Sequence, residues 1–148
     1  KARQNLMLAA SQAGMAFSNS SVALVHGMSR PIGAHFHVAH GLSNAMLLPT
    51  ITEFSIKGSK ERYATCARAM KWAEENDTDE TACSKLIENL FILNEDLKVP
   101  SPRSLGYSVN DDLLKLMALQ ALASGSPQNN PRVPTENQII QLYQKVWE

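Results

Sequence analysis

Apolar residues recur at spacings of three and four along almost the whole chain, and this pattern constrains the fold more than any other feature of the sequence. No stretch shows the sustained alternation of polar and apolar residues that is typical of a half-buried β-strand. The pattern therefore predicts an all-α protein without a sheet. With 148 residues, of which 44% are hydrophobic, the chain has the size of one domain and enough apolar side chains to form a core.

Turn-forming and capping residues divide the pattern into about seven helices, which we expect to form one helical bundle. Ser18 to Ser21 should be a polar break whose serines cap the following helix. The missing backbone N–H of Pro31 and the flexibility of Gly33 predict a bend or break between residues 29 and 33. The predicted helices cover residues 1–17, 22–28, 42–56, 61–72, 79–97, 111–123 and 136–147, with a short helical stretch resuming toward His37.

Other local signals place helix ends and loops. Thr78 or Asp79, Asn110 and Thr135 are expected N-caps, and Thr135 with Gln138 forms a predicted capping box. A second break is expected at residues 39–41, a kink at Pro49, and loops at residues 101–108 and 124–132.

Charge and hydropathy exclude several classes of protein. Lysine plus arginine equals aspartate plus glutamate, so no net positive charge favours nucleic acid or an anionic membrane surface. No apolar run approaches the ~20 residues of a membrane-spanning helix, and no signal segment opens the chain. We expect a cytoplasmic protein that binds neither nucleic acid nor membrane.

The first residues are unlike the start of a protein. Residues 1–17 are predicted to be helical from the outset, without an initiating Met and without a capping residue ahead of them. Leu6 and Phe17 lie on one apolar face of this helix. We therefore expect the chain to continue a helical domain that begins upstream.

The strongest chemical signal is a cluster of histidines. His26, His35, His37 and His40 are the four histidines of the chain, and they lie within fifteen positions. Imidazole is a common ligand of zinc, iron, copper and nickel, and histidines on facing helices of a bundle can share one metal site. A bend between His26 and His40 would bring these two residues together.

Two histidines do not complete a catalytic metal site. Catalytic zinc or iron usually has three or more protein ligands, often including a carboxylate, and this window contains none. From spacing alone, either the chain binds no metal and its histidines are structural, or the other ligands come from residues outside the chain.

Two longer motifs carry a resemblance to a known family. Residues 25–34 (VHGMSRPIGA) and 39–49 (AHGLSNAMLLP) closely resemble the second signature region of the iron-containing alcohol dehydrogenases. Residues 14–19 (GMAFSN) resemble the segment before that region, and residues 130–147 resemble the end of the family's C-terminal domain. The resemblance implies the C-terminal metal-binding domain of the dehydroquinate synthase-like or iron-containing alcohol dehydrogenase fold, incomplete at its N-terminal side.

The resemblance also implies a site. In this family one aspartate and three histidines hold Fe²⁺, or sometimes Zn²⁺, and the last two histidines match His26 and His40. The aspartate, the first histidine and the domain that binds NAD or NADP would precede Lys1. The implied activity is hydride transfer between an alcohol or aldehyde substrate and the nicotinamide, by an enzyme expected to be a homo-oligomer. A fragment with two of four ligands is expected to be inactive alone.

Three positions near these motifs matter for the chemistry. Phe17 matches an aromatic residue that lines the family's substrate cleft, although it could equally be a core residue. Arg30 replaces a histidine that many relatives use in proton relay. A guanidinium is not a general base near neutral pH, so Arg30 is expected to contact a substrate carboxylate or a cofactor phosphate, or else to form a structural ion pair. Ala39 replaces a common proline.

Two other functions compete with the dehydrogenase. The presence of Arg30 is also compatible with a second hypothesis, a hydroxyacid–oxoacid transhydrogenase of the same family, which needs no added nicotinamide. A non-catalytic helical interaction module, with structural histidines, would instead show a continuous exposed apolar groove and no bound metal.

Overall fold

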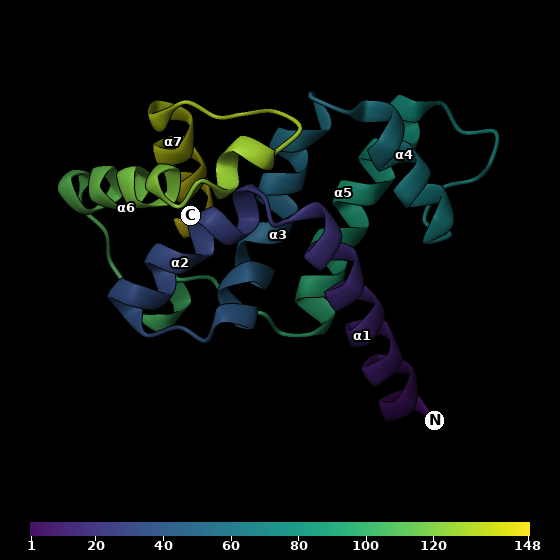
Figure 1. Ribbon diagram of the computed structural model, residues 1–148, viewed down its shortest axis with the longest axis horizontal. Helices are drawn as coiled ribbons and strands as arrows, with labels where there is room; N and C mark the ends of the chain where they lie inside the picture. Colours follow the sequence, from purple (N-terminus) through teal and green to yellow (C-terminus); the bar gives the residue numbers. More distant parts are fainter.

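The computed structural model describes residues 1–148 and confirms an all-α chain with seven α-helices and no strand (Figure 1). Two short 3₁₀ helices, η1 and η2, lie within the predicted loops. None of the helices combines the length and hydrophobicity needed to cross a membrane. The elements are α1 (Ala2–Ser20), α2 (Leu24–Phe36), α3 (His40–Ile56), α4 (Lys60–Ala69), α5 (Asp79–Asp96), η1 (Arg103–Leu105), α6 (Asp111–Ala123), η2 (Ser126–Asn129) and α7 (Glu136–Trp147).

The larger of two hydrophobic cores surrounds α2. Leu24, Met28 and Ile32 on α2 are fully buried among side chains of α3, α6 and α7. Tyr143 of α7 is also fully buried, and its hydroxyl donates a hydrogen bond of 2.7 Å to the backbone oxygen of Met28. Burial raises the pKa of Tyr143, so this hydroxyl stays protonated and remains a donor. The position of α2 is therefore fixed from several sides.

A second, smaller core joins α4 to α5. Ala64, Ala67, Ala82 and Leu86 form most of it, and the small side chains of the three alanines let the two helices approach closely. The side-chain amide of Asn94 on α5 donates a hydrogen bond of 2.8 Å to the backbone oxygen of Ala45 on α3. The expected single bundle is thus two packed helical groups that meet through α3 and α5 (Figure 1).

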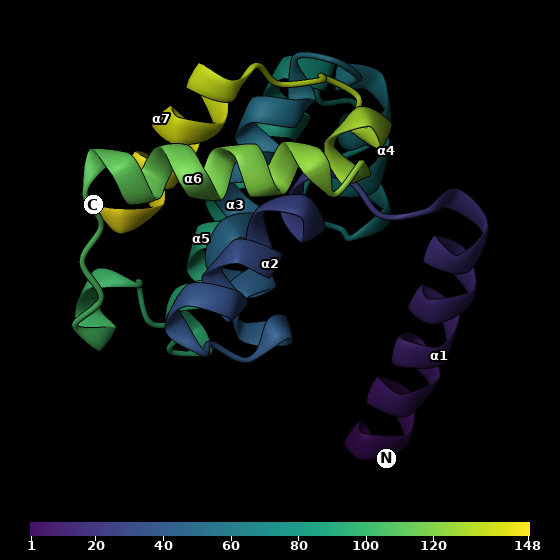
Figure 2. The ribbon, with the colours of Figure 1, turned by 60° about the vertical axis from the view of Figure 1, so that its left-hand side comes forward.

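Helix α1 projects away from both cores and buries no residue (Figure 2). Leu6 and Met7 are at least 70% exposed, and Phe17 at the other end is half exposed. The predicted apolar face of the first helix is therefore exposed to solvent.

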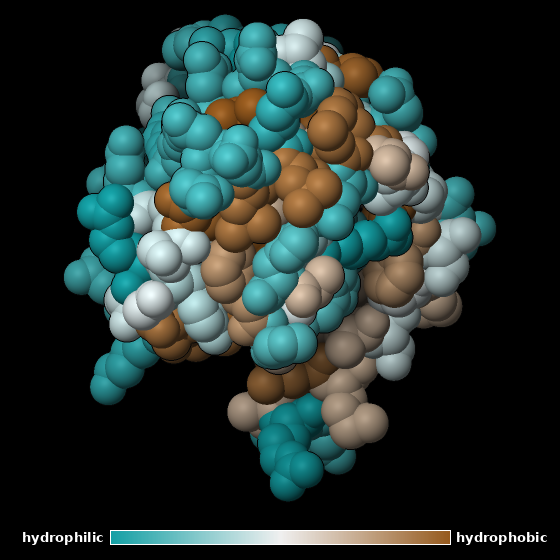
Figure 3. Space-filling model, turned by 90° about the vertical axis from the view of Figure 1, so that its left-hand side faces the viewer, coloured by the Kyte–Doolittle hydropathy of each residue, from teal (hydrophilic) through white to brown (hydrophobic).

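Figure 3 shows hydrophobic side chains at the surface on the side of the molecule where α6 lies, and Leu116 and Leu119 of that helix are also half exposed.

The predicted break around Pro31 is wrong, because α2 runs without interruption from Leu24 to Phe36. Pro31 removes one helical hydrogen bond, but it is itself buried, as are Met28 and Ile32 on either side. Burial of this face in the larger core offsets the lost bond. Helix α3 likewise continues through Pro49 and begins at His40, so the break expected at residues 39–41 lies at residues 37–39.

Helix ends divide into confirmed and failed predictions. Thr78, Asn110 and Thr135 cap their helices through side-chain oxygens, and the capping box of Thr135 with Gln138 is present. The serines of residues 18–21 do not cap α2, whose N-cap is Ala23. Instead, Ser18 and Ser20 donate hydrogen bonds to backbone oxygens four residues earlier, in the last turn of α1.

We expect Tyr143→Phe to lower the free energy of unfolding by about 1 kcal/mol, the usual net value of one buried hydrogen bond. The substitution keeps the ring and removes only the bond to Met28. Tyr107→Phe is the matched control, because the Tyr107 hydroxyl has no hydrogen-bond partner, and it should change stability by less than about 0.5 kcal/mol. Urea unfolding followed by circular dichroism measures both. Equal effects of the two substitutions would contradict this role of Tyr143.

Candidate metal and substrate site

His26 and His40 lie side by side, on the first turn of α2 and at the first residue of α3. Their ring centroids are 5.2 Å apart, and the ring planes are inclined by 54°. The two imidazole rings are thus neighbours in the structure although they are fourteen positions apart in the sequence. The structure brings together the two histidines that the family motif singles out.

The turn between α2 and α3 produces this approach. His37 adopts the left-handed conformation (φ 55°), and its backbone N–H donates to the backbone oxygen of Gly33 at 3.0 Å, which closes α2. Val38 is buried behind the turn. Only Val38 and Ala39 then remain before α3 begins, and α3 packs back along α2. The reversal occurs at His37 and not at Pro31.

Two polar side chains hold the His40 ring. The Ser29 hydroxyl lies 3.4 Å from Nδ1, and the Asn44 amide nitrogen lies 3.2 Å from Nε2. Both neighbours are placed by helical geometry: Ser29 is three residues after His26, and Asn44 is four residues after His40. The Asn44 Oδ1 atom is buried and has no hydrogen-bond partner, so the site leaves a polar oxygen unsatisfied beside the two rings.

The electrostatic environment favours a neutral His26. Burial lowers the pKa of His26 below its ordinary value of 6.5, and His40 and then Arg30 lower it further by charge repulsion. The ring of His26 makes no hydrogen bond to another side chain or to the backbone. Neutral imidazole with a free nitrogen lone pair is the form that binds a metal ion.

The donors present fit part of a metal site. His26 offers a free ring, and His40 offers a nitrogen if a metal replaces one of its two contacts, with the other contact left to orient the ring. The chain contains no group of three or more histidine, cysteine, aspartate or glutamate side chains arranged to hold a metal ion. The pair is therefore chemically suited to a transition metal but needs ligands from elsewhere.

An apolar pocket of about 500 Å³ adjoins the histidine pair. His26, Asn44 and Ser21 are its polar lining residues, and Phe17 forms part of its wall, with the Phe17 ring 6.5 Å from that of His26. The remaining lining comes from the α1–α2 connection and from two helices: Val22, Ala23, Val25, Gly41, Ala45 and Leu48. Such a pocket suits a small molecule with an apolar body and one oxygen near the histidines.

The other candidates from the sequence lie outside this pair. His35 contacts the side-chain oxygen of Gln120 at 2.9 Å, and His37 is exposed at the end of α2. Neither shares a site with His26 and His40. Arg30 is exposed one turn after His26 on α2, within electrostatic reach of it.

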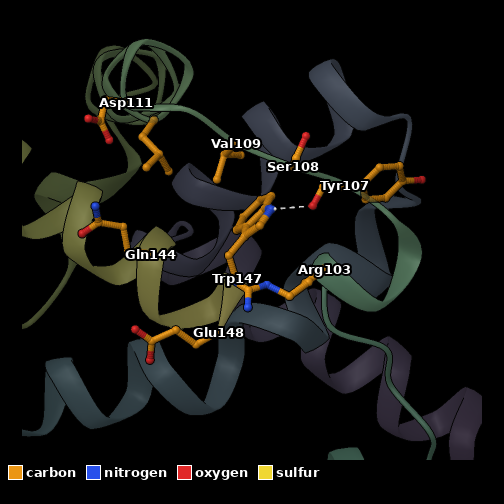
Figure 4. Close-up of a pocket in the computed structure, with 9 residues that line it drawn as sticks. Arg103, Tyr107, Ser108, Val109, Asp111, Gln144, Trp147 and Glu148 are labelled. Carbon is orange, nitrogen blue, oxygen red and sulfur yellow. Dashed lines mark hydrogen bonds between the residues drawn. The ribbon is translucent and has the colours of Figure 1, made fainter.

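A second pocket of about 470 Å³ lies where the loop before α6 meets the end of α7 (Figure 4). Trp147 forms its centre, and the indole N–H donates a hydrogen bond of 3.2 Å to the backbone oxygen of Tyr107. Arg103, Asp111 and Glu148 add charges of both signs at its edge, but no histidine reaches it. The paired imidazoles of His26 and His40 therefore lie at the other pocket and not at this one.

Sequence reasoning missed Ser29 and Asn44. Serine and asparagine are common residues, and the sequence alone does not indicate that Ser29 and Asn44 contact the His40 ring. Their helical spacing from His26 and His40 is the signal that could have identified them. The aliphatic wall of the pocket, from Val22 to Leu48, gave no signal of its own because such residues usually belong to a core.

Comparison with known proteins identifies the family of this chain. Residues 1–147 match the family described as Fe-containing alcohol dehydrogenase family, C-terminal. Lactaldehyde reductase of Escherichia coli K12 is 36% identical over 91% of this chain and 35% of its own length. The 1,3-propanediol dehydrogenase of Citrobacter freundii is 30% identical over 99% of this chain and 38% of its own length. The chain thus spans little more than a third of the length of these relatives.

Solved structures show the same arrangement of helices. A 1,3-propanediol oxidoreductase superposes with a TM-score of 0.84 at 30% identity, over 90% of this chain and 35% of that one. An alcohol dehydrogenase from Oenococcus oeni gives 0.82 at 32% identity, over the same shares. Sequence and structure together show that this chain belongs to the iron-containing alcohol dehydrogenase family and corresponds to its C-terminal helical domain.

Proposed function

We propose that the protein carrying this chain is a metal-dependent, NAD(P)-dependent alcohol dehydrogenase, and that His26 and His40 are two of its metal ligands. The observation that carries the proposal is the pair of imidazoles 5.2 Å apart at the edge of an apolar pocket. The remaining ligands and the nucleotide-binding domain would come from other parts of the protein.

The residues of this chain would have three tasks. Neutral His26 and His40 would hold the ion, and Ser29 or Asn44 would fix the orientation of the His40 ring. Fe²⁺ or Zn²⁺ supplies Lewis acidity to the oxygen of an alcohol or carbonyl substrate, whose carbon exchanges hydride with a nicotinamide. Phe17 and the aliphatic wall would exclude water from the apolar part of the substrate.

The pocket and the relatives support small aliphatic substrates. Relatives of this chain are called lactaldehyde reductase, 1,3-propanediol dehydrogenase and NADPH-dependent butanol dehydrogenase. A wall of valine, alanine, leucine and phenylalanine beside two histidines matches a short carbon chain with one reacting oxygen. We therefore propose a small primary or secondary alcohol and its aldehyde or ketone as the substrate pair.

A hydroxyacid–oxoacid transhydrogenase is a second candidate, because Arg30 places a permanent positive charge near the pocket. It differs from a dehydrogenase in one measurable property. A transhydrogenase completes cycles with a hydroxy acid and an oxo acid and no added nicotinamide, whereas a dehydrogenase needs added NAD(P) to accept the hydride.

We predict that His26→Ala and His40→Ala each weaken metal binding by about 100-fold or more, since even residues that only support a ligand change affinity 10–100-fold. Zinc and iron content by elemental analysis, with alcohol-dependent NAD(P) reduction in parallel, measures this on the full-length protein. His35→Ala is the matched control, because His35 contacts Gln120 away from the pair. Metal and turnover that survive both substitutions would show that the ligand assignment is wrong.

We also predict that His26 titrates below pH 6.5 in the metal-free protein and that Arg30→Gln raises its pKa, since that change removes one repelling positive charge. Burial, the largest cause, remains, so the pKa should stay below 6.5. The unfolded chain then binds this proton more tightly than the folded chain, and His26 lowers stability as the pH falls through 6.5. NMR titration of the imidazole resonances tests this, with His26→Gln for assignment. A pKa above 6.5 would contradict it.

A further inference from the structure

The connection between α1 and α2 carries a strained residue at the edge of the pocket. Ser21 adopts φ 66° and ψ −178°, a backbone conformation that almost only glycine occupies. A serine stays in this conformation only where its surroundings hold it there. Ser21 and Val22 are both lining residues of the pocket beside His26, so whatever holds them also sets the position of this wall.

Asn129, at the end of η2, supplies that hold. Its side-chain nitrogen donates a hydrogen bond of 3.0 Å to the backbone oxygen of Val22 and lies 3.3 Å from the hydroxyl oxygen of Ser21. No other hydrogen bond joins residues 18–23 to any part of the chain beyond α2. Within the connection, the Ser20 hydroxyl reaches the backbone oxygen of Ser21 only at 3.4 Å. One amide group therefore fixes two successive residues of the pocket wall.

The short helix η2 is in turn anchored on both sides of this amide group. Pro127 is fully buried against Gly27, where a Cβ atom would lie only 3.0 Å from the proline Cδ, so η2 approaches α2 as closely as a glycine allows. Gly27 directly follows His26. On the other side, the buried Asn130 donates a hydrogen bond of 2.9 Å to the hydroxyl of Ser55 on α3. Because both anchors are buried, η2 is a fixed point that holds the wall at a set distance from the histidine pair.

The position of Phe17 depends on the same connection. Helix α1 buries none of its residues, and Figure 2 shows that it leaves the rest of the molecule at this point. Phe17 lies in the last turns of α1, and its ring forms the pocket wall 6.5 Å from the ring of His26. Asn129 is not itself a lining residue of the pocket. Its influence on the pocket therefore passes through the residues that it holds.

We propose that Asn129 is a positioning residue for the substrate: it holds the α1–α2 connection so that the pocket wall packs on the carbon chain of the alcohol, which favours longer chains over shorter ones. The proposal rests on the proposed function for the kind of substrate, whereas the hold on the wall rests on contacts alone. Asn129 forms no hydrogen bond with either histidine of the pair, so its removal should alter binding of the carbon chain more than the chemical step.

Steady-state kinetics of the full-length protein with 1-butanol and ethanol test this role, because 1-butanol has two more methylene groups to bury against the wall. Asn129→Ala should raise the KM for 1-butanol relative to that for ethanol about 3- to 10-fold, the range for loss of one net hydrogen bond. The ratio of the two kcat values should change little. A loss of stability alone would lower turnover of both alcohols equally and leave the KM ratio as it is.

Two further variants define the contact that matters. Asn129→Asp should reproduce the effect of Asn129→Ala, since aspartate has the same shape but no N–H to donate to Val22. Gln128→Ala is the matched control at an exposed residue of η2 whose side chain forms no hydrogen bond, and it should leave both ratios unchanged.

A measurement on the wall itself separates this proposal from the proposed function. The methyl order parameter of Val22, measured by NMR on selectively labelled full-length protein, should fall in Asn129→Ala and not in Gln128→Ala. Val146, in the larger core, is a reference that neither substitution should change. Loss of Val22 order in a protein that turns over neither alcohol would refute the dehydrogenase but support the hold of Asn129 on the wall. Val22 order that Asn129→Ala leaves unaffected, or an unaffected KM ratio with both alcohols turned over, would overturn the proposal.

Discussion

The packing of α2 against α3, α6, α7 and η2 is the interaction on which the rest of the structure depends. One face of α2 is buried through Leu24, Met28 and Ile32, and Tyr143 anchors the same face by its hydrogen bond to Met28. Because this face is fixed, the rotation of the helix about its axis is fixed too. The opposite face then presents His26 to the pocket, and Arg30 is exposed to solvent four residues further along the helix. A site on a firmly packed helix needs few contacts of its own to stay in place.

The placement of the histidine pair depends on where the chain reverses. A break at Pro31 would have separated the turn that carries His26 from Ile32 and the end of the helix, whereas the intact α2 keeps His26, Ser29 and Ile32 in one continuous helix. The reversal at His37 instead leaves α3 to begin at His40, with its ring against both Ser29 and Asn44. The two imidazoles therefore come from two rigid helices, and the flexible part of the motif lies outside the pair.

The sequence was sufficient for features that depend on local spacing. Seven helices, the caps at Asn110 and Thr135, and the proximity of His26 and His40 could all be predicted, because each rests on residues a few positions apart or on a family motif. It was insufficient where tertiary burial outweighs local preference. The proline in α2 is tolerated because its surroundings are buried, and the contacts of His40 with Ser29 and Asn44 exist only once two helices are packed.

The exposure of α1 has a thermodynamic consequence for the pocket that it borders. A 19-residue helix that buries none of its residues is only marginally stable in water, so α1 has little to oppose fraying. Phe17 belongs to this helix and also to the pocket wall beside His26. Any surface that covers α1 would thus also order one wall of the pocket, and a molecule in the pocket would help to order α1. Occupancy of the pocket and docking of α1 would then be positively cooperative, because each reduces the conformational entropy that the other must lose.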